Sequence, residues 1–74
     1  NFKSKLIEWS QKERKEVNFN VVTEIGSGTN KQYIVEIKVD NDTCATGQDY
    51  SIKGAEKIAA EKAFATLHLE EYAY

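Results

Sequence analysis

Two lysines, Lys53 and Lys57, stand four residues apart where a helix is predicted to begin. Like charges at this spacing slightly destabilise a helix, and the positive end of the helix dipole disfavours cations near the start. Two cations kept at such a place indicate that the helix start binds an anion from outside the chain. The alternative is that Lys57 forms a surface ion pair with Glu61, which would contribute little to stability.

Three polar side chains, those of Ser4, Glu8 and Gln11, recur at spacings of four and three residues. In a helix this spacing places them on one face, where hydroxyl, carboxylate and amide groups can take part in hydrogen bonds. Considered alone, such a face is most simply explained as a solvated helix surface. Trp9 lies on the apolar side of the same segment and is expected to pack in the core rather than to stack on a base.

No set of residues has the spacing of a catalytic or metal centre. The sequence has no glycine-rich phosphate loop, no histidine or carboxylate cluster at metal-binding spacing and no nucleophile elbow. Its one cysteine, Cys44, and its one histidine, His68, exclude an internal disulfide and leave too few soft ligands for structural zinc. We expect Cys44 to fill space in a strand and His68 to lie on the surface at a helix end. The chain itself is expected to need no cofactor.

The composition is typical of one small globular domain, since the 74 residues are 41% hydrophobic and 30% charged. The net charge of -2 and the isoelectric point near 5.3 argue against a general polyanion binder. The first 17 residues nevertheless carry more basic than acidic side chains, and the acidic excess falls later in the chain. No apolar run is long enough to span a membrane and no signal-peptide pattern opens the chain, so we expect a reducing, cytoplasmic setting.

The first part of the chain changes from a helical to a strand-like period. Phe2, Leu6 and Trp9 form a short apolar stripe at helical spacing, so residues 1–15 are predicted to be a helix. From residue 19 to residue 25 the pattern takes a period of two, which predicts a strand. The cluster Gly26-Ser27-Gly28-Thr29-Asn30 then predicts a loop.

The clearest strand covers residues 33–39, with Glu36 and Lys38 pointing to solvent. Its other face is apolar and consists of Tyr33, Val35, Ile37 and Val39. Residues 40–42 are predicted to be a tight turn, because Asp and Asn tolerate left-handed backbone. Residues 43–48 follow as a third strand with weaker patterning.

Ser51 is predicted to cap a second helix over residues 53–69. The side of this helix that faces inward is expected to consist of Ala55, Ile58, Ala59, Ala63 and Leu67. Short connections make the three strands antiparallel, and both helices must cover the one apolar face of the sheet. The predicted fold class is therefore α+β, in the order α-β-β-β-α, with one domain over residues 1–69 and a tail at 70–74.

Three blocks of residues resemble the double-stranded RNA-binding domain. The first block consists of Lys3-Ser4, Leu6, Glu8-Trp9 and Gln11. The second is the loop at 26–31 followed by Tyr33-x-Val35-Glu36-x-x-Val39. The third is Gly47-x-x-x-Ser51-x-Lys53-x-Ala55-Glu56-x-x-Ala59-Ala60-Glu61-x-Ala63. The blocks keep the family's order and spacing over nearly the whole chain, and they are most similar to the domain at the C-terminal end of bacterial ribonuclease III.

This resemblance implies a module that binds double-stranded RNA by its shape, largely independently of sequence, over about 16 base pairs. The first helix would contact 2′-hydroxyl groups, the loop would enter the next minor groove, and the second helix would contact the phosphates between them. The RNA-binding residues implied in this way are Ser4, Glu8, Gln11, Gly28, Thr29, Asn30, Lys31, Lys53 and Lys57.

The resemblance also implies a parent protein. It would be a ribonuclease III, a Mg-dependent endonuclease and hydrolase of RNA processing that forms a homodimer through its nuclease domain. The acidic signature motif of that domain does not occur in these 74 residues. Catalysis is therefore expected to belong to another part of the parent protein, and this chain alone is expected not to be an enzyme.

Some positions depart from the family's pattern. Ile52 stands where a second basic residue is usual, and Asp49 stands where glycine is common and would be unfavourable near a phosphate. Gly54 costs the second helix about 1 kcal/mol relative to alanine. We therefore expect weak to moderate RNA binding. The departures also leave open the alternative that the chain has the same fold but serves as a protein–protein interaction module with weak or no RNA binding.

Overall fold

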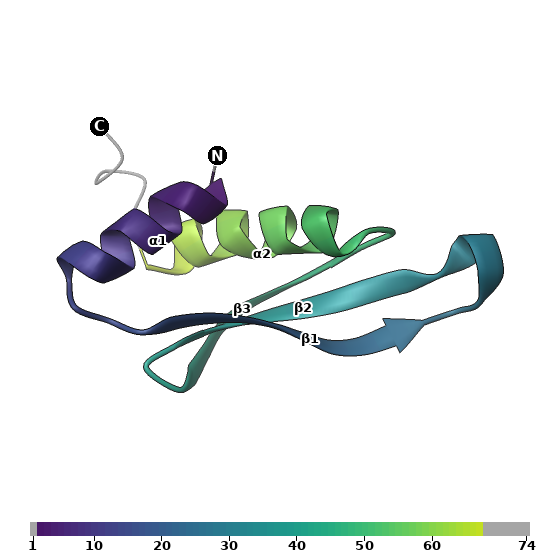
Figure 1. Cartoon of the computed structure of the whole chain (residues 1–74), viewed down its shortest axis with the longest axis horizontal. Helices are drawn as coiled ribbons and strands as arrows, with labels where there is room; N and C mark the ends of the chain where they lie inside the picture. The colour runs from purple at the N-terminus through teal and green to yellow at the C-terminus, as the bar shows by residue number, and fades with distance from the viewer. Residues whose placement is uncertain (1, 68–74) are drawn as a thin grey trace.

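The structure is a computed structural model that describes residues 2–67. In chain order the elements are α1 (Phe2–Lys12), β1 (Val17–Ile25), the short 3-10 helix η1 (Gly28–Asn30), β2 (Gln32–Val39), β3 (Asp42–Asp49) and α2 (Ile52–Thr66) (Figure 1). The predicted order α-β-β-β-α is confirmed. The predicted tail at 70–74, the surface position of His68 and the predicted ends of the helices at residues 1 and 69 lie outside the described residues.

The strands form one antiparallel sheet in the order β1-β2-β3, and both helices lie on the same face of it (Figure 1). In the register, Ile37 of β2 lies between Phe19 of β1 and Ala45 of β3. Asp40 and Asn41 connect β2 to β3 with φ angles of 52° and 72°. Left-handed backbone at both positions is typical of a type I′ turn, whose twist matches that of the strands, and the predicted turn is confirmed.

Helix α1 ends at Lys12 rather than near residue 15, so this predicted boundary was wrong. Arg14 has a φ of 56°, in the left-handed region. The Lys15 N–H donates to the Ser10 carbonyl over 2.8 Å, and the Arg14 N–H donates to the Gln11 carbonyl over 3.3 Å. These two bonds end the helix as a Schellman motif. The left-handed position of this motif is usually glycine, so the sequence lacks the ordinary signal for the helix end.

Helix α2 approaches the sheet closely through small residues. Ala55, Ala59 and Ala63 are fully buried, as predicted. Gly47 of β3 packs against the first two of these, and a Cβ added to Gly47 would overlap the backbone of Ala55 and Ala59. The missing side chain at Gly47 therefore sets the distance between β3 and α2.

The buried face of α2 differs in part from the predicted one. Ile58 and Leu67 are only half-buried, whereas Ala60 and Phe64, which were not predicted to face inward, are buried. The ring of Phe64 packs edge-on against Phe2 of α1, with the ring centroids 5.2 Å apart. Helix α1 packs beside α2 as well as on the sheet, so the inward face of α2 turns partly towards α1.

The outer half of the β1–β2 hairpin extends beyond the two helices (Figure 1). Val21, Val22 and Ile25 of β1 are exposed there. The pairing register shifts between Val21 and Thr23, and a bulge of this kind bends a strand. The hairpin therefore carries η1 away from the core and into solvent.

Candidate nucleic-acid interface

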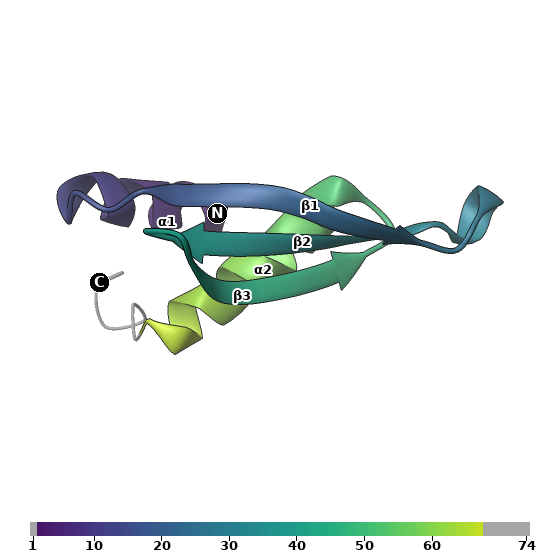
Figure 2. The same ribbon diagram turned by 90° about the horizontal axis from the view of Figure 1, so that it is seen from below.

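The three predicted contact surfaces follow one another along the molecule. Figure 2 shows α1, the start of α2 and η1 in this order along the side on which β1 lies. The molecule measures 40 Å in its longest dimension. A protein that reads successive minor grooves of one RNA duplex needs its contact points in such a row.

The outer face of α1 carries Ser4, Glu8 and Gln11, and all three are exposed. Leu6 and Trp9 are buried on the opposite face, so the amphipathic pattern of the helix decides which side faces outward. Glu8 forms no ion pair with any residue from 2 to 67. Its carboxylate can therefore accept a hydrogen bond from a hydroxyl or amino group of a ligand.

A hollow of about 510 Å³ lies between the start of α1 and the first turns of α2. The hollow is lined by Phe2, Lys3, Lys53, Glu56 and Lys57. Neither Lys53 nor Lys57 forms an ion pair within the described part of the chain, so the alternative pairing of Lys57 with Glu61 is not found there. The structure thus brings the two predicted lysines together at one surface, and the acid of this surface, Glu56, pairs with neither of them.

Lys3 is a third lysine at this hollow, and it was not predicted as a contact residue. Its Nζ lies 3.0 Å from Oε1 of Glu56, which joins α1 to α2. The same ammonium lies 5.2 Å from the centroid of the Phe19 ring on β1. The sequence contains no sign of this pair, because its members are 53 positions apart and only the packing of the two helices brings them together.

The first turn of α2 is capped as predicted. Ser51 Oγ accepts a hydrogen bond from the Gly54 N–H over 3.0 Å. One oxygen of Asp49 accepts from the Tyr50 N–H over 2.8 Å, and the other occupies the space that a Cβ on Gly54 would take. Gly54 therefore makes room for an acidic group beside the helix start. This group interacts favourably with the helix dipole but opposes a phosphate at the same place.

The loop between β1 and β2 depends on two glycines with left-handed backbone. The φ angle is 81° at Gly26 and 61° at Gly28, a region that glycine enters without steric cost. The Asn30 N–H donates to the Ser27 carbonyl over 3.2 Å and closes the turn. Gly28, Thr29 and Asn30 are all exposed, as a loop that enters a groove requires.

Lys31, at the end of this loop, already has an acidic partner. Its Nζ lies 3.0 Å from Oε2 of Glu24, and the hydrogen bond to Glu24, followed by the charge of Glu24, raises the pKa of Lys31. The ammonium also lies 5.6 Å from the centroid of the Tyr33 ring. A phosphate would therefore have to compete with Glu24 for Lys31.

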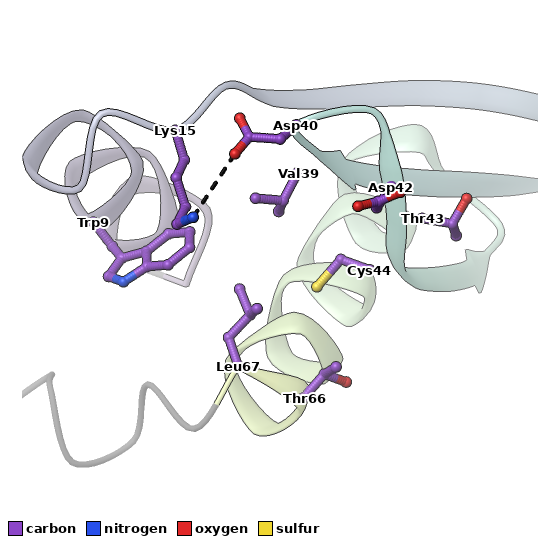
Figure 3. A pocket seen from close by; sticks show the side chains of 9 residues that line it. All are labelled: Trp9, Lys15, Val39, Asp40, Asp42, Thr43, Cys44, Thr66 and Leu67. Atoms are coloured by element: carbon purple, nitrogen blue, oxygen red, sulfur yellow. Dashed lines mark ion pairs between the residues drawn. The ribbon is translucent and has the colours of Figure 1, made fainter.

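A second pocket, of about 340 Å³, lies between the end of α1, the turn from β2 to β3 and the end of α2 (Figure 3). It is lined by Trp9, Lys15, Val39, Asp40, Asp42, Thr43, Cys44, Thr66 and Leu67. None of the predicted RNA-binding residues belongs to it. Lys15 and Asp40 pair at its rim over 3.8 Å, and burial raises the pKa of the Cys44 thiol. Cys44 packs against the core, which agrees with the predicted space-filling role.

Comparison with known proteins covers almost the whole chain, because a family model described as a double-stranded RNA binding motif matches residues 2–67. The chain belongs to this family. The motif is 39% identical to a ribonuclease 3 of Bacteroides thetaiotaomicron and 44% identical to one of Phocaeicola vulgatus, each over 64 residues. Both alignments cover 85% of this chain and 21% of the relative. A ribonuclease 3 of Zunongwangia profunda is 36% identical over 66 residues, which cover 89% of this chain and 27% of that relative.

The motif occupies residues 2–67 and therefore almost all of these 74 residues. The chain spans only 21% to 27% of the length of these three relatives. The predicted family and the predicted class, a double-stranded RNA-binding module, are confirmed. The roles of the individual residues remain predictions.

Proposed function

We propose that this RNA-binding motif recognises duplex RNA by its shape, with little dependence on sequence. The observation that carries the proposal is the row formed by the polar face of α1, the hollow beside α2 and the loop around η1. A-form RNA displays 2′-hydroxyl groups in a wide, shallow minor groove, and phosphates line the deep groove between two such faces. The order of chemical groups along the protein is the same: hydroxyl-binding side chains, cations, and a small-residue loop.

Each part of the row has a proposed role. Ser4, Glu8 and Gln11 exchange hydrogen bonds with 2′-hydroxyl groups, and Glu8 is suited to a hydroxyl or a guanine amino group because it accepts hydrogen bonds but repels phosphate. Lys53 and Lys57 contact the backbone phosphates. Residues 28–31 enter the next minor groove, where small exposed side chains allow the backbone to approach the sugars.

A titration followed by fluorescence anisotropy tests this proposal. The chain is added to an RNA duplex of about 20 base pairs and, separately, to a DNA duplex of the same sequence. We expect tighter binding to RNA and a shallow dependence on salt, because few phosphates are neutralised. Equal affinity for the two duplexes at low salt, or binding to neither, would contradict the proposal.

Lys53→Ala examines the role of the hollow. The substitution is expected to weaken binding for all duplex sequences alike and to reduce the slope of log K against log salt by about one, because one phosphate contact is lost. Lys62→Ala removes the same charge from an exposed position of α2 outside the hollow and is the matched control. If the two variants bind equally, Lys53 has no phosphate role.

The alternative is a protein-binding module of the same fold. The position of Asp49 beside the start of α2 is the observation that favours it, because an acidic group there opposes a phosphate. The titration separates the two functions, since a domain that no longer binds RNA will not prefer the RNA duplex to the DNA duplex.

We also propose that the chain serves as the RNA-binding part of a ribonuclease III. The names of its relatives support this, and such a parent would be a Mg-dependent, homodimeric endonuclease in the cytoplasm. Within residues 2–67 no three His, Cys, Asp or Glu side chains are grouped so that they could hold a metal ion. The described residues therefore do not fit Mg²⁺, and no cleavage step is assigned to them. None of the helices in the same range is long and apolar enough to cross a membrane.

A further inference from the structure

The ion pair between Lys3 and Glu56 lies at the same hollow as Lys53 and Lys57. Among the described residues that line the hollow, three are lysines and Glu56 is the one acid. The Glu56 side chain is 18% exposed and that of Lys3 is 42% exposed. The acidic side chain is therefore more buried than the lysine side chain with which it pairs.

We propose that the hollow holds one backbone phosphate of the duplex and that Glu56 competes with this phosphate for Lys3. The inference rests on the proposed function, because it concerns how tightly the same surface binds RNA. In the free protein the Lys3 ammonium donates a hydrogen bond to the Glu56 carboxylate over 3.0 Å. A phosphate that enters the hollow accepts hydrogen bonds from the same kind of donor and is repelled by the carboxylate. Glu56 thus stands in for the phosphate and keeps the affinity for RNA low.

Lys3 is positioned so that it stays at the hollow when Glu56 no longer carries a charge. Its ammonium lies 5.2 Å from the centre of the Phe19 ring, and a cation over an aromatic ring is attracted to the ring face. The side chain starts from the first turn of α1, next to Phe2, which packs on Phe64. With the Glu56 charge removed, we expect the Lys3 ammonium to pair with the phosphate instead of with Glu56.

Glu56→Gln tests the inference, because the amide oxygen of glutamine still accepts a hydrogen bond from Lys3 while the negative charge is lost. The matched control is Glu61→Gln, which removes the same charge from an exposed position of α2 outside the hollow. Binding to an RNA duplex of about 20 base pairs is measured between about 50 and about 200 mM salt. At about 50 mM salt we expect Glu56→Gln to bind RNA more tightly than wild type does. Its slope of log K against log salt should be steeper by about 0.9, the value for one further phosphate contact. The ratio of its affinity to that of wild type then falls roughly threefold between about 50 and about 200 mM salt, whereas Glu61→Gln leaves the slope unchanged.

Lys3→Gln, alone and combined with Glu56→Gln, distinguishes competition from a purely structural clamp. If Glu56 acts through Lys3, Glu56→Gln no longer steepens the salt slope once Lys3 is removed. Equal affinity and slope in Glu56→Gln and Glu61→Gln, with wild type still preferring RNA, would overturn the inference alone. Weaker RNA binding by Glu56→Gln together with a lower melting temperature would show a clamp and would also overturn it. If wild type shows no preference for RNA, the proposed function fails and the inference fails with it.

Discussion

Gly47→Ala adds a single methyl group at the place where α2 lies closest to the sheet. Gly47 is buried in β3, opposite Val35 of β2. The new Cβ would overlap the carbonyl oxygen of Ala55 and the backbone nitrogen of Ala59. Both obstacles are backbone atoms of one helix, so no side-chain rotation relieves them. The chain can accept the methyl group only if α2 moves away from β3.

The cost of this movement can be judged from typical magnitudes. Overpacking a core costs about 1–3 kcal/mol, and we expect the upper end because the obstacles cannot rotate away. A chain of 74 residues has a total stability of roughly 4–11 kcal/mol at about 0.05–0.15 kcal/mol per residue. Each kcal/mol moves the melting temperature of a domain of this size by about 4–8 °C. Gly47→Ala should therefore lower it by roughly 12–24 °C.

Thermal unfolding followed by circular dichroism measures the change, and Gly54→Ala is the control. At Gly54 an added Cβ meets side-chain atoms of Asp49 and comes within 3.0 Å of Ser51 Oγ, and both of these side chains can rotate. Alanine also gains about 1 kcal/mol of helix propensity. We expect the free energy of unfolding of this control to differ from that of wild type by no more than about 1 kcal/mol, in either direction. A fall of less than about 4 °C in Gly47→Ala would refute the conclusion that Gly47 sets the height of α2 above the sheet.

Two further outcomes follow from local geometry. Arg14→Gly should raise the free energy of unfolding by about 0.5–1 kcal/mol, because glycine adopts the φ of 56° without strain; an unchanged urea midpoint would speak against this account of the helix end. Cys44 should react with iodoacetamide more slowly in the folded chain than in the unfolded chain at about pH 8, because burial raises its pKa and the thiolate is the nucleophile. Equal rates of Cys44 alkylation in the folded and the unfolded chain, measured by mass spectrometry, would contradict the raised pKa. The stability linked to this thiol is fully present below its unfolded pKa and is lost as the pH rises through its folded pKa.

The elements of the fold could be predicted from local signals, because each helix and strand carries its own periodicity. The strand pattern ending at Val39, the Asp40-Asn41 turn and the Ser51 cap are all signals of adjacent residues, and the structure contains all three. The end of α1 could not be predicted, because Arg14 takes a conformation for which the sequence offers no glycine. The burial of Phe64 also depends on tertiary packing, since it is decided by the position of Phe2 on another helix.

In the candidate interface, too, features that depend on adjacent residues could be predicted, and features that depend on tertiary packing could not. Lys53 and Lys57 were predicted from their spacing along one helix to act at one place, and both line one hollow in the structure. Lys3 and Glu56 were missed as a pair, because their meeting depends on how two distant helices cross. Gly54 was predicted as a cost to α2. The structure adds that its missing side chain makes room for the Asp49 carboxylate, a contact that the sequence pattern does not show.

The total charge of -2 is a poor guide to the surface proposed to face RNA, because acids and lysines are distributed unequally over the molecule. Elsewhere three lysines each form an ion pair with an acid close by, in the pairs Lys15–Asp40, Lys31–Glu24 and Lys38–Glu36. At the hollow, three lysines face a single acid, and the group is still positive when Asp49 beside the helix start is included. Charges act on a phosphate over a Debye length of about 8–10 Å at physiological salt. The net charge of the groups near the hollow, rather than that of the whole chain, therefore governs the attraction of a phosphate. An acidic domain can bind a polyanion where its own acids leave a few lysines unneutralised.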